Sequence, residues 1–100
     1  MFTRTVLVKL TDEWSSPEGR ATVADCSQAA LSAIPGVVSA SAMVPADPAS
    51  LESWDLMLQI HFANYDDIEP YRVHPDHLTF LNDYLSPKAV IKKVWNWAGD

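Results

Sequence analysis

The sequence predicts an α+β protein with a ferredoxin-like βαββαβ order, in which two helices cover one face of a four-stranded antiparallel sheet. Four segments have the alternation or β-branched composition of strands, and two have helical periodicity. The helical segments follow the first and third strands, so right-handed crossovers place both on the same face. One hundred residues suffice for one domain, which we expect to span residues 1–100.

The first strand and the first helix have clear local signals. Residues 3–10 form an apolar, β-branched run with apolar side chains on both faces, which predicts a central strand. A helix then starts in Ser15-Ser16-Pro17-Glu18. Either Ser15 is the N-cap and Glu18 closes a capping box, or Ser16 is the N-cap and Pro17 the first helical residue. Small apolar residues follow at helical spacing until Pro35-Gly36 ends the helix.

The middle of the chain predicts two strands separated by a loop. Residues 37–44 form the second strand, and the loop at 45–48 contains two prolines and an aspartate. Residues 54–62 form the third strand by alternation. One face of this strand carries Leu56, Leu58, Ile60 and Phe62, and the other carries Asp55, Met57, Gln59 and His61.

The second helical region is predicted to be broken. Asn64 can cap its start, and Pro70 must kink or shorten the helix. His74 precedes Pro75, which disfavours helical backbone at residue 74 and lets Pro75 open a new segment that runs to Leu85. Residues 90–98 alternate again and form the fourth strand.

The helix-free face of the predicted sheet is unusually apolar. By alternation it carries Leu7, Met57, Trp95 and Trp97, with His61 among the polar residues beside them. Two tryptophans and a methionine exposed together exceed what a monomer ordinarily leaves in water. We therefore expect a homodimer that packs sheet against sheet, with these five residues at the interface.

Composition excludes several classes of partner. The net charge is −6, from seven basic and thirteen acidic residues, so the chain cannot form the basic face that nucleic acid requires. No apolar stretch is long enough to cross a membrane, and no signal peptide is recognisable, which favours a cytoplasmic protein. Cys26, the single cysteine, is expected to be partly buried and unreactive.

Residues 71–77, Tyr71-Arg72-Val73-His74-Pro75-Asp76-His77, hold two of the three histidines. A metal site is one interpretation, but Pro75 breaks the register that would bring the two rings together, and we expect no metal. Acid–base chemistry is the second, because histidine titrates near neutral pH and a tyrosine can orient it or stabilise an oxyanion. The third is a helix junction with no chemical role.

The chain resembles the stress-responsive A/B barrel (Dabb) family over nearly its whole length. The resemblance rests on the Tyr-x-x-His-Pro-x-His run at residues 71–77, supported by residues 6–10, 31–37 and 94–97. It implies a dimeric α+β barrel and an association with stress responses. A plant branch of the family consists of polyketide cyclases, which close an aromatic ring without a cofactor in a pocket between sheet and helices.

The resemblance carries two functional positions of that branch to this chain. They fall on Tyr71 and His77, which would be catalytic residues of a cyclase-like enzyme. Two other pocket positions differ, since a histidine of the branch is replaced by Arg4 and a tyrosine by Ser27. No cofactor is expected.

The resulting hypothesis is a pocket between the sheet and the second helical region. His77 and Tyr71 form its polar end, with Arg4, Leu58, Ile60 and His74 as further ligand-binding residues, and Ala24 and Ser27 leave space above it. A pocket arginine would attract a ligand that bears a carboxylate. We expect a homodimer that binds a small, partly apolar ligand; the alternatives are the cyclase-like enzyme and a non-catalytic stress or structural protein.

Overall fold

The computed structural model describes residues 1–99 and contains a four-stranded antiparallel sheet in the order β2-β3-β1-β4. Residue 100, the last of the expected domain, lies outside the described residues. The strands are β1 (Phe2–Leu10), β2 (Ser39–Met43), β3 (Leu56–Phe62) and β4 (Ala89–Ala98). The predicted ferredoxin-like order is therefore confirmed, with β1 in a central position.

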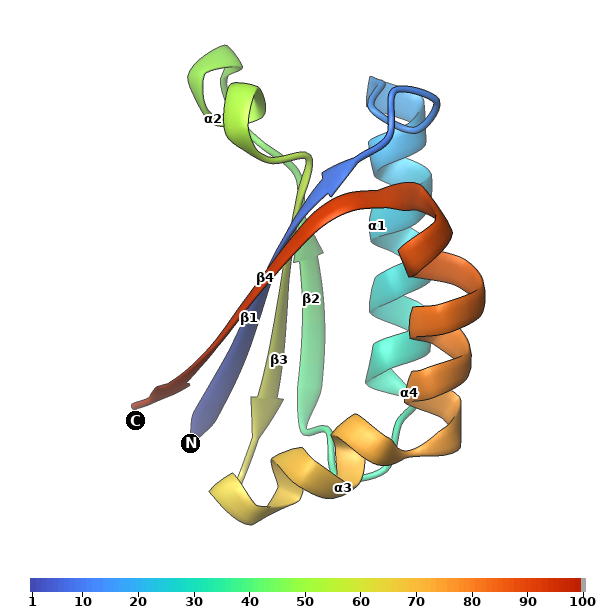
Figure 1. Cartoon of the computed structure of the whole chain (residues 1–100). Helices are drawn as coiled ribbons and strands as arrows, with labels where there is room; N and C mark the ends of the chain where they lie inside the picture. Colours follow the sequence, from blue (N-terminus) through green and yellow to red (C-terminus); the bar gives the residue numbers. More distant parts are fainter. Residues whose placement is uncertain (100) are drawn as a thin grey trace.

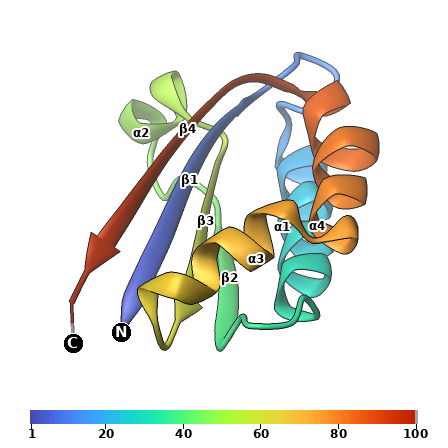
Figure 2. The ribbon, with the colours of Figure 1, turned by 60° about the horizontal axis from the view of Figure 1, so that its bottom comes forward.

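The helices lie mainly on one side of the sheet (Figure 1). They are α1 (Pro17–Ser32), α3 (Ile68–Val73) and α4 (Pro75–Thr79), with two short 3-10 helices, η1 (Tyr65–Asp67) and η3 (Ser86–Lys88), and a π-helical segment, η2 (Phe80–Leu85). Another short helix, α2 (Pro48–Ser53), stands apart at one end of the sheet, away from α1 and α4 (Figure 2). In the described part of the chain, no helix is both long and apolar enough to cross a membrane.

Strand register determines which side chains face the helices. Val6 pairs with Leu58 on one side and with Val94 on the other, so these three side chains share the helix-facing side of the sheet. The core between this side and the helices contains Val8, Ile60 and Phe62, which are fully buried. From α1 it receives Val23 and Leu31, at the helical spacing that the sequence predicts.

The N-caps of α1 and α2 show where each of these helices begins. Ser16 is the N-cap of α1, and its Oγ accepts a hydrogen bond of 3.0 Å from the amide of Gly19. The loop prediction for residues 45–48 is wrong at its end, because Pro48 begins α2 and the Asp47 carboxylate accepts from the amide of Ser50 at 2.8 Å. An aspartate followed by proline has the character of an N-cap and first helical residue as well as that of a loop.

Asp55 was expected on the helix-free face and is instead completely buried. It lies just before β3, where strand alternation no longer applies. Its carboxylate accepts hydrogen bonds from the amide of Leu10 at 2.8 Å and from the hydroxyl of Ser15 at 2.6 Å, and it lies 3.4 Å from the guanidinium of Arg20. The end of β1, the start of α1 and the start of β3 are thus held together by one side chain.

The predicted break in the second helical region is confirmed. His74 has extended backbone, with φ −62° and ψ 137°, and separates α3 from α4. Its Nδ1 accepts a hydrogen bond of 3.1 Å from the amide of Asp76, so the imidazole caps α4. Pro70 is the third residue of α3, which ends only three residues later.

The position of Cys26 corrects another expectation, since this residue is exposed rather than partly buried. The buried side of α1 contains Val23 and Ser27. One residue corresponds to about 100° around a helix, and that rotation turns Cys26 away from the sheet.

Candidate functional site

A cavity of about 120 Å³ lies between the sheet and the segment formed by α4 and η2. Its apolar lining comes from both layers: Val6, Leu31, Leu58, Phe80, Leu81, Leu85 and Val94. Its polar lining consists of Arg4, Tyr71, His77 and Lys92. A space in which a few polar groups converge within an apolar wall is the usual form of a small-molecule site.

His77 is held with one ring nitrogen available. The residue is only 8% exposed, and its Nδ1 lies 2.8 Å from the carbonyl oxygen of Arg72. A carbonyl oxygen only accepts, so Nδ1 carries the hydrogen and Nε2 is the basic nitrogen of the neutral ring. Burial lowers the pKa of His77 from its ordinary value of 6.5, although the bond to Arg72 opposes this shift. The imidazole is therefore neutral at pH 7 and able to accept a proton.

Tyr71 packs directly against this imidazole. The centres of the two rings are 4.5 Å apart with 41° between their planes, and Phe62 packs on Tyr71 at 5.1 Å. Burial raises the pKa of Tyr71 to about 12, with the positive charge of Arg4 opposing the shift. The phenol stays protonated at neutral pH, so its hydroxyl can donate a hydrogen bond to an oxygen of a ligand.

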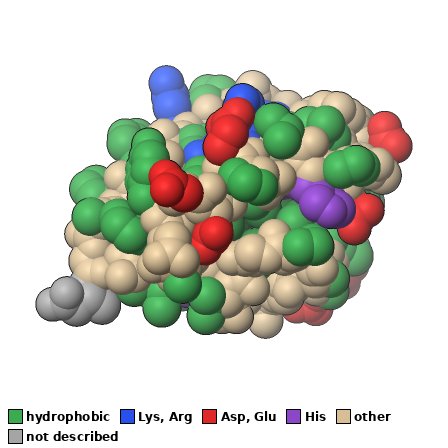
Figure 3. Space-filling view, turned by 90° about the horizontal axis from the view of Figure 1, so that it is seen from below, with side chains coloured by type: hydrophobic (Ala, Val, Ile, Leu, Met, Phe, Trp, Pro, Cys, Tyr) green, Lys and Arg blue, Asp and Glu red, His purple; other side chains and the backbone are tan. Residues whose placement is uncertain are grey.

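Arg4 connects the cavity with the surface. Its Nη1 donates a hydrogen bond of 3.1 Å to the side-chain oxygen of Asn96, the residue opposite it on β4. Burial lowers the pKa of Arg4, but a guanidinium remains charged at any physiological pH. Arg4 also lines a polar hollow of about 320 Å³ with Glu69, Arg72 and Asn96. Figure 3 shows this end of the molecule, where acidic and basic side chains lie among apolar ones.

The structure brings together four of the six residues that the sequence assigned to a pocket: Arg4, Leu58, Tyr71 and His77. Ile60 is fully buried in the core, and His74 caps α4; neither lines the cavity, and nor do Ala24 and Ser27. Lys92 lines it and was missed. The alternation of the fourth strand puts Lys92 on the helix-facing side with Val94, so the sequence contained the information that places Lys92 at the cavity. A lysine in such a strand is, however, more typical of a solvated sheet edge.

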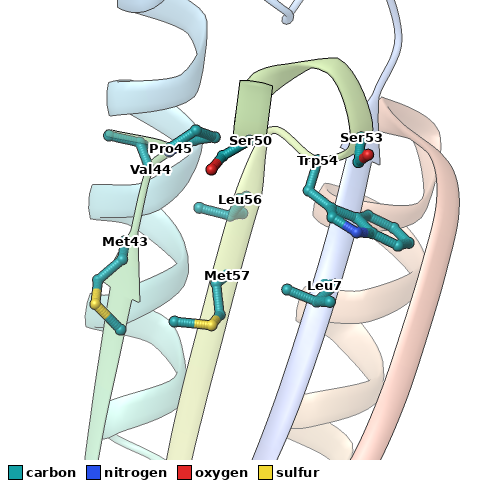
Figure 4. A pocket seen from close by; sticks show the side chains of 9 residues that line it. All are labelled: Leu7, Met43, Val44, Pro45, Ser50, Ser53, Trp54, Leu56 and Met57. Carbon is teal, nitrogen blue, oxygen red and sulfur yellow. The ribbon is translucent and has the colours of Figure 1, made fainter. Parts of the chain in front are cut away.

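A larger groove of about 490 Å³ lies at the other face of the sheet (Figure 4). Leu7, Met43 and Met57 form its floor, and Trp54 and the residues around α2 form its rim. None of the described residues that line it is ionisable, so these residues offer hydrophobic contact but no acid or base. Of these two spaces, only the smaller cavity has an acid or a base in its lining.

The other residues predicted on this face are accessible in the single chain. Trp95 and Trp97 are 43% and 56% exposed. His61 is half-buried, and its Nδ1 lies 3.0 Å from the hydroxyl of Thr3 on the neighbouring strand. Within residues 1–99, no three His, Cys, Asp or Glu side chains cluster in a way that could hold a metal ion.

Comparisons with known proteins give a family and a fold. A family model described as "Stress responsive A/B Barrel Domain" (Dabb) matches residues 2–91. A comparison with curated proteins gives no match.

Solved structures of similar fold come from several organisms. A Dabb family protein with a ferredoxin-like fold from Mesorhizobium loti superposes with a TM-score of 0.80 at 22% identity, over 99% of this chain and 96% of that one. A dimeric ferredoxin-like protein of unknown function from Bacteroides fragilis gives 0.75 at 22% identity, over 98% and 95%. A hydroxynitrile lyase from Passiflora edulis gives 0.78 at 13% identity, over 99% and 93%.

Proposed function

The chain belongs to the stress responsive A/B barrel (Dabb) family, and on that premise we propose that it is a homodimeric protein that binds a small, partly apolar ligand in the cavity beneath His77. The observation that carries the proposal is the cavity itself. It places Arg4, Tyr71 and His77 against a wall that includes Val6 and Leu58. A buried histidine, a buried tyrosine and an arginine with spare donors would be a costly way to fill a core that needed only packing.

The size of the cavity limits the ligand. About 120 Å³ corresponds to roughly four water molecules, and sites for drug-sized molecules are usually ~300 Å³ or more. A ligand of fewer than about ten heavy atoms is the appropriate scale for this volume. A long polyketide chain would extend well beyond a cavity of this size, so the volume favours small-molecule binding over cyclase activity on a polyketide.

Thermal unfolding in the presence of small compounds tests the binding. A ligand present at ten times its Kd stabilises the native state by about 1.4 kcal/mol. For a chain of this length that corresponds to a rise in Tm of several degrees. We expect such shifts from compounds that combine an apolar body with one polar group.

Two variants test whether the compounds bind in this cavity. Leu81→Phe adds bulk to the cavity wall and should abolish the shift, whereas Val90→Phe adds the same ring at an exposed position that does not line the cavity and should keep it. The proposal fails if no compound stabilises the wild type, or if the Leu81→Phe protein responds as the wild type does.

Acid–base chemistry is a second candidate function, favoured by the tautomer of His77. Because Nδ1–H is bonded to the carbonyl of Arg72, Nε2 is the basic nitrogen, and the phenol of Tyr71 is a proton donor beside it. His77 would abstract a proton and Tyr71 would stabilise the oxyanion, each contributing about a hundredfold or more in rate. Hydrogen–deuterium exchange at the α-carbon of a small ketone, followed by NMR, would detect this. His77→Gln should remove any acceleration, and an acceleration that persists would exclude the assignment.

The homodimer would form across the helix-free face. Ile91, Trp95 and Trp97 are each more than 40% exposed on β4, and the groove at Leu7 and Met57 continues the same face. The Bacteroides fragilis protein of similar fold is described as dimeric. Light scattering at micromolar concentration tests this part, and a molecular mass near 11.1 kDa would contradict it.

A further inference from the structure

Arg4 is the arginine of this chain without a carboxylate partner among the described residues. Arg20 pairs with the buried Asp55 at 3.4 Å, and Arg72 makes a two-pronged contact with Glu69 at 2.8 and 2.9 Å. Within residues 1–99, the Arg4 guanidinium donates to the neutral amide oxygen of Asn96 and to no carboxylate. Asp66 and Glu69 line the same polar hollow as Arg4, but neither forms an ion pair with it. A partly buried guanidinium that makes no ion pair keeps N–H donors free for an anionic group in the cavity.

The ionisable side chains that line the cavity are either positively charged or neutral at pH 7. Lys92 lines it together with Arg4, and no aspartate or glutamate among residues 1–99 does. The two cations differ in what they can still bind. The ammonium of Lys92 already donates to the hydroxyl of Ser86 at 2.8 Å, whereas the guanidinium of Arg4 has five N–H donors of which Asn96 uses one.

The two cations also lie at different ends of the cavity. Lys92 pairs with Val8, and Arg4 precedes Val8 by four residues on the same face of β1, a separation of about 13 Å along the strand. The space between them is walled by Val6 and Val94. A ligand small enough for the cavity therefore presents one anionic group at the Arg4 end and an apolar body toward the valines.

We propose that the ligand of this cavity is a small monocarboxylic acid, bound as the carboxylate by Arg4 with Tyr71 as a second donor. This inference rests on the small-molecule function proposed above and names its ligand class. The planar fork of a guanidinium matches a carboxylate with two parallel hydrogen bonds. A phosphate has more oxygens to satisfy, and the apolar wall of Leu58 and Val6 offers them no donors.

Isosteric acid and amide pairs isolate the charge. Benzoate and benzamide have the same number of heavy atoms, as do isobutyrate and isobutyramide, and both pairs lie in the size range that the cavity sets. Titration calorimetry with the wild-type protein at pH 7 should give a Kd for each acid at least about tenfold lower than for its amide, because only the acid makes charge-assisted hydrogen bonds. This comparison needs no variant.

Two variants then locate the charge. Arg4→Gln should weaken acid binding to the level of the amide and leave amide affinity within about threefold. Arg72→Gln removes the same charge from a residue that is already paired and lies outside the cavity, so acid binding should be retained.

The outcomes separate this inference from the function on which it rests. If acid and amide bind equally well, cavity binding stands and the carboxylate assignment is wrong. If acid binds better but Arg4→Gln preserves the difference, the anion sits elsewhere and the assignment is again wrong. If neither member of either pair binds but neutral compounds of the thermal screen do, the assignment of a monocarboxylic acid is wrong and cavity binding stands. If no compound binds, the proposed function is wrong as well.

Discussion

Replacing Asp55 by alanine should remove more stability than any exposed substitution in this chain. The carboxylate is fully buried, and the side chain of Arg20 beside it is only 12% exposed. The substitution leaves the buried amide of Leu10 without its acceptor, frees the hydroxyl of Ser15, and strands the guanidinium of Arg20. Neither Asp55 nor Arg20 lines the cavity, so the change acts on folding and not on the candidate site.

The magnitude follows from the number of broken contacts. Removing one partner of a buried ion pair typically costs about 3–5 kcal/mol, because the other charge stays buried. The amide of Leu10 adds about 1–3 kcal/mol, and the three losses overlap since they share one carboxylate. We expect about 4 kcal/mol in total, a large part of the ~5–15 kcal/mol by which a domain is usually stable.

Urea unfolding at pH 7 measures this cost. Asp83→Ala, an acid-to-alanine change at an exposed position, is the matched control and should stay within about 0.5 kcal/mol of the wild type. Arg20→Met alone should be destabilising, and the double variant should lose less than the sum of the two single losses. A loss below about 1 kcal/mol for Asp55→Ala, or simple additivity with Arg20→Met, would show that this cluster does not hold β1, α1 and β3 together.

Three further predictions concern charge, assembly and the thiol. Because burial holds the folded-state pKa of His77 below its ordinary 6.5, the stability that neutral His77 contributes is fully present above pH 6.5 and is lost as pH falls from 6.5 through the lower folded-state pKa. His77→Gln should flatten the urea-unfolding profile between pH 7 and 5, and an unchanged profile would contradict the shift. Trp95→Asp should give a monomer or an unfolded chain in light scattering, since an unpaired charge in an apolar interface costs several kcal/mol, whereas a dimer of wild-type stability would exclude Trp95 from the interface. Cys26 should react with a thiol reagent in the native state at a rate close to that in urea, given its exposure; strong protection would indicate that something covers α1 there.

The sequence was sufficient for the architecture because each strand and each break has a local cause. Alternation on β3 and the pair His74-Pro75 depend only on nearby residues, and the structure has both. The loop at 45–48 was misjudged at Pro48, because a proline after an aspartate can end one element or begin another. Asp55 was misplaced because alternation was extended one residue before the strand begins.

The candidate site was predictable only in part. Arg4, Leu58 and His77 could be placed on one side of the sheet from strand parity and the motif, and the structure puts them around one cavity. Ile60 has the same parity but packs into the core. Which residues of one face border an empty space depends on side-chain volumes across two layers, and a single strand does not contain that information.

A crystal structure of the protein with bound benzoate tests the central claim most directly. We predict the aromatic ring packed against Val6 and Leu58, with the carboxylate within hydrogen-bonding distance of the Arg4 guanidinium and the Nδ1 of His77 still bonded to the carbonyl of Arg72. Benzoate found only in the groove at Leu7 and Met57, or a cavity left empty at a concentration that saturates binding in solution, would contradict the account.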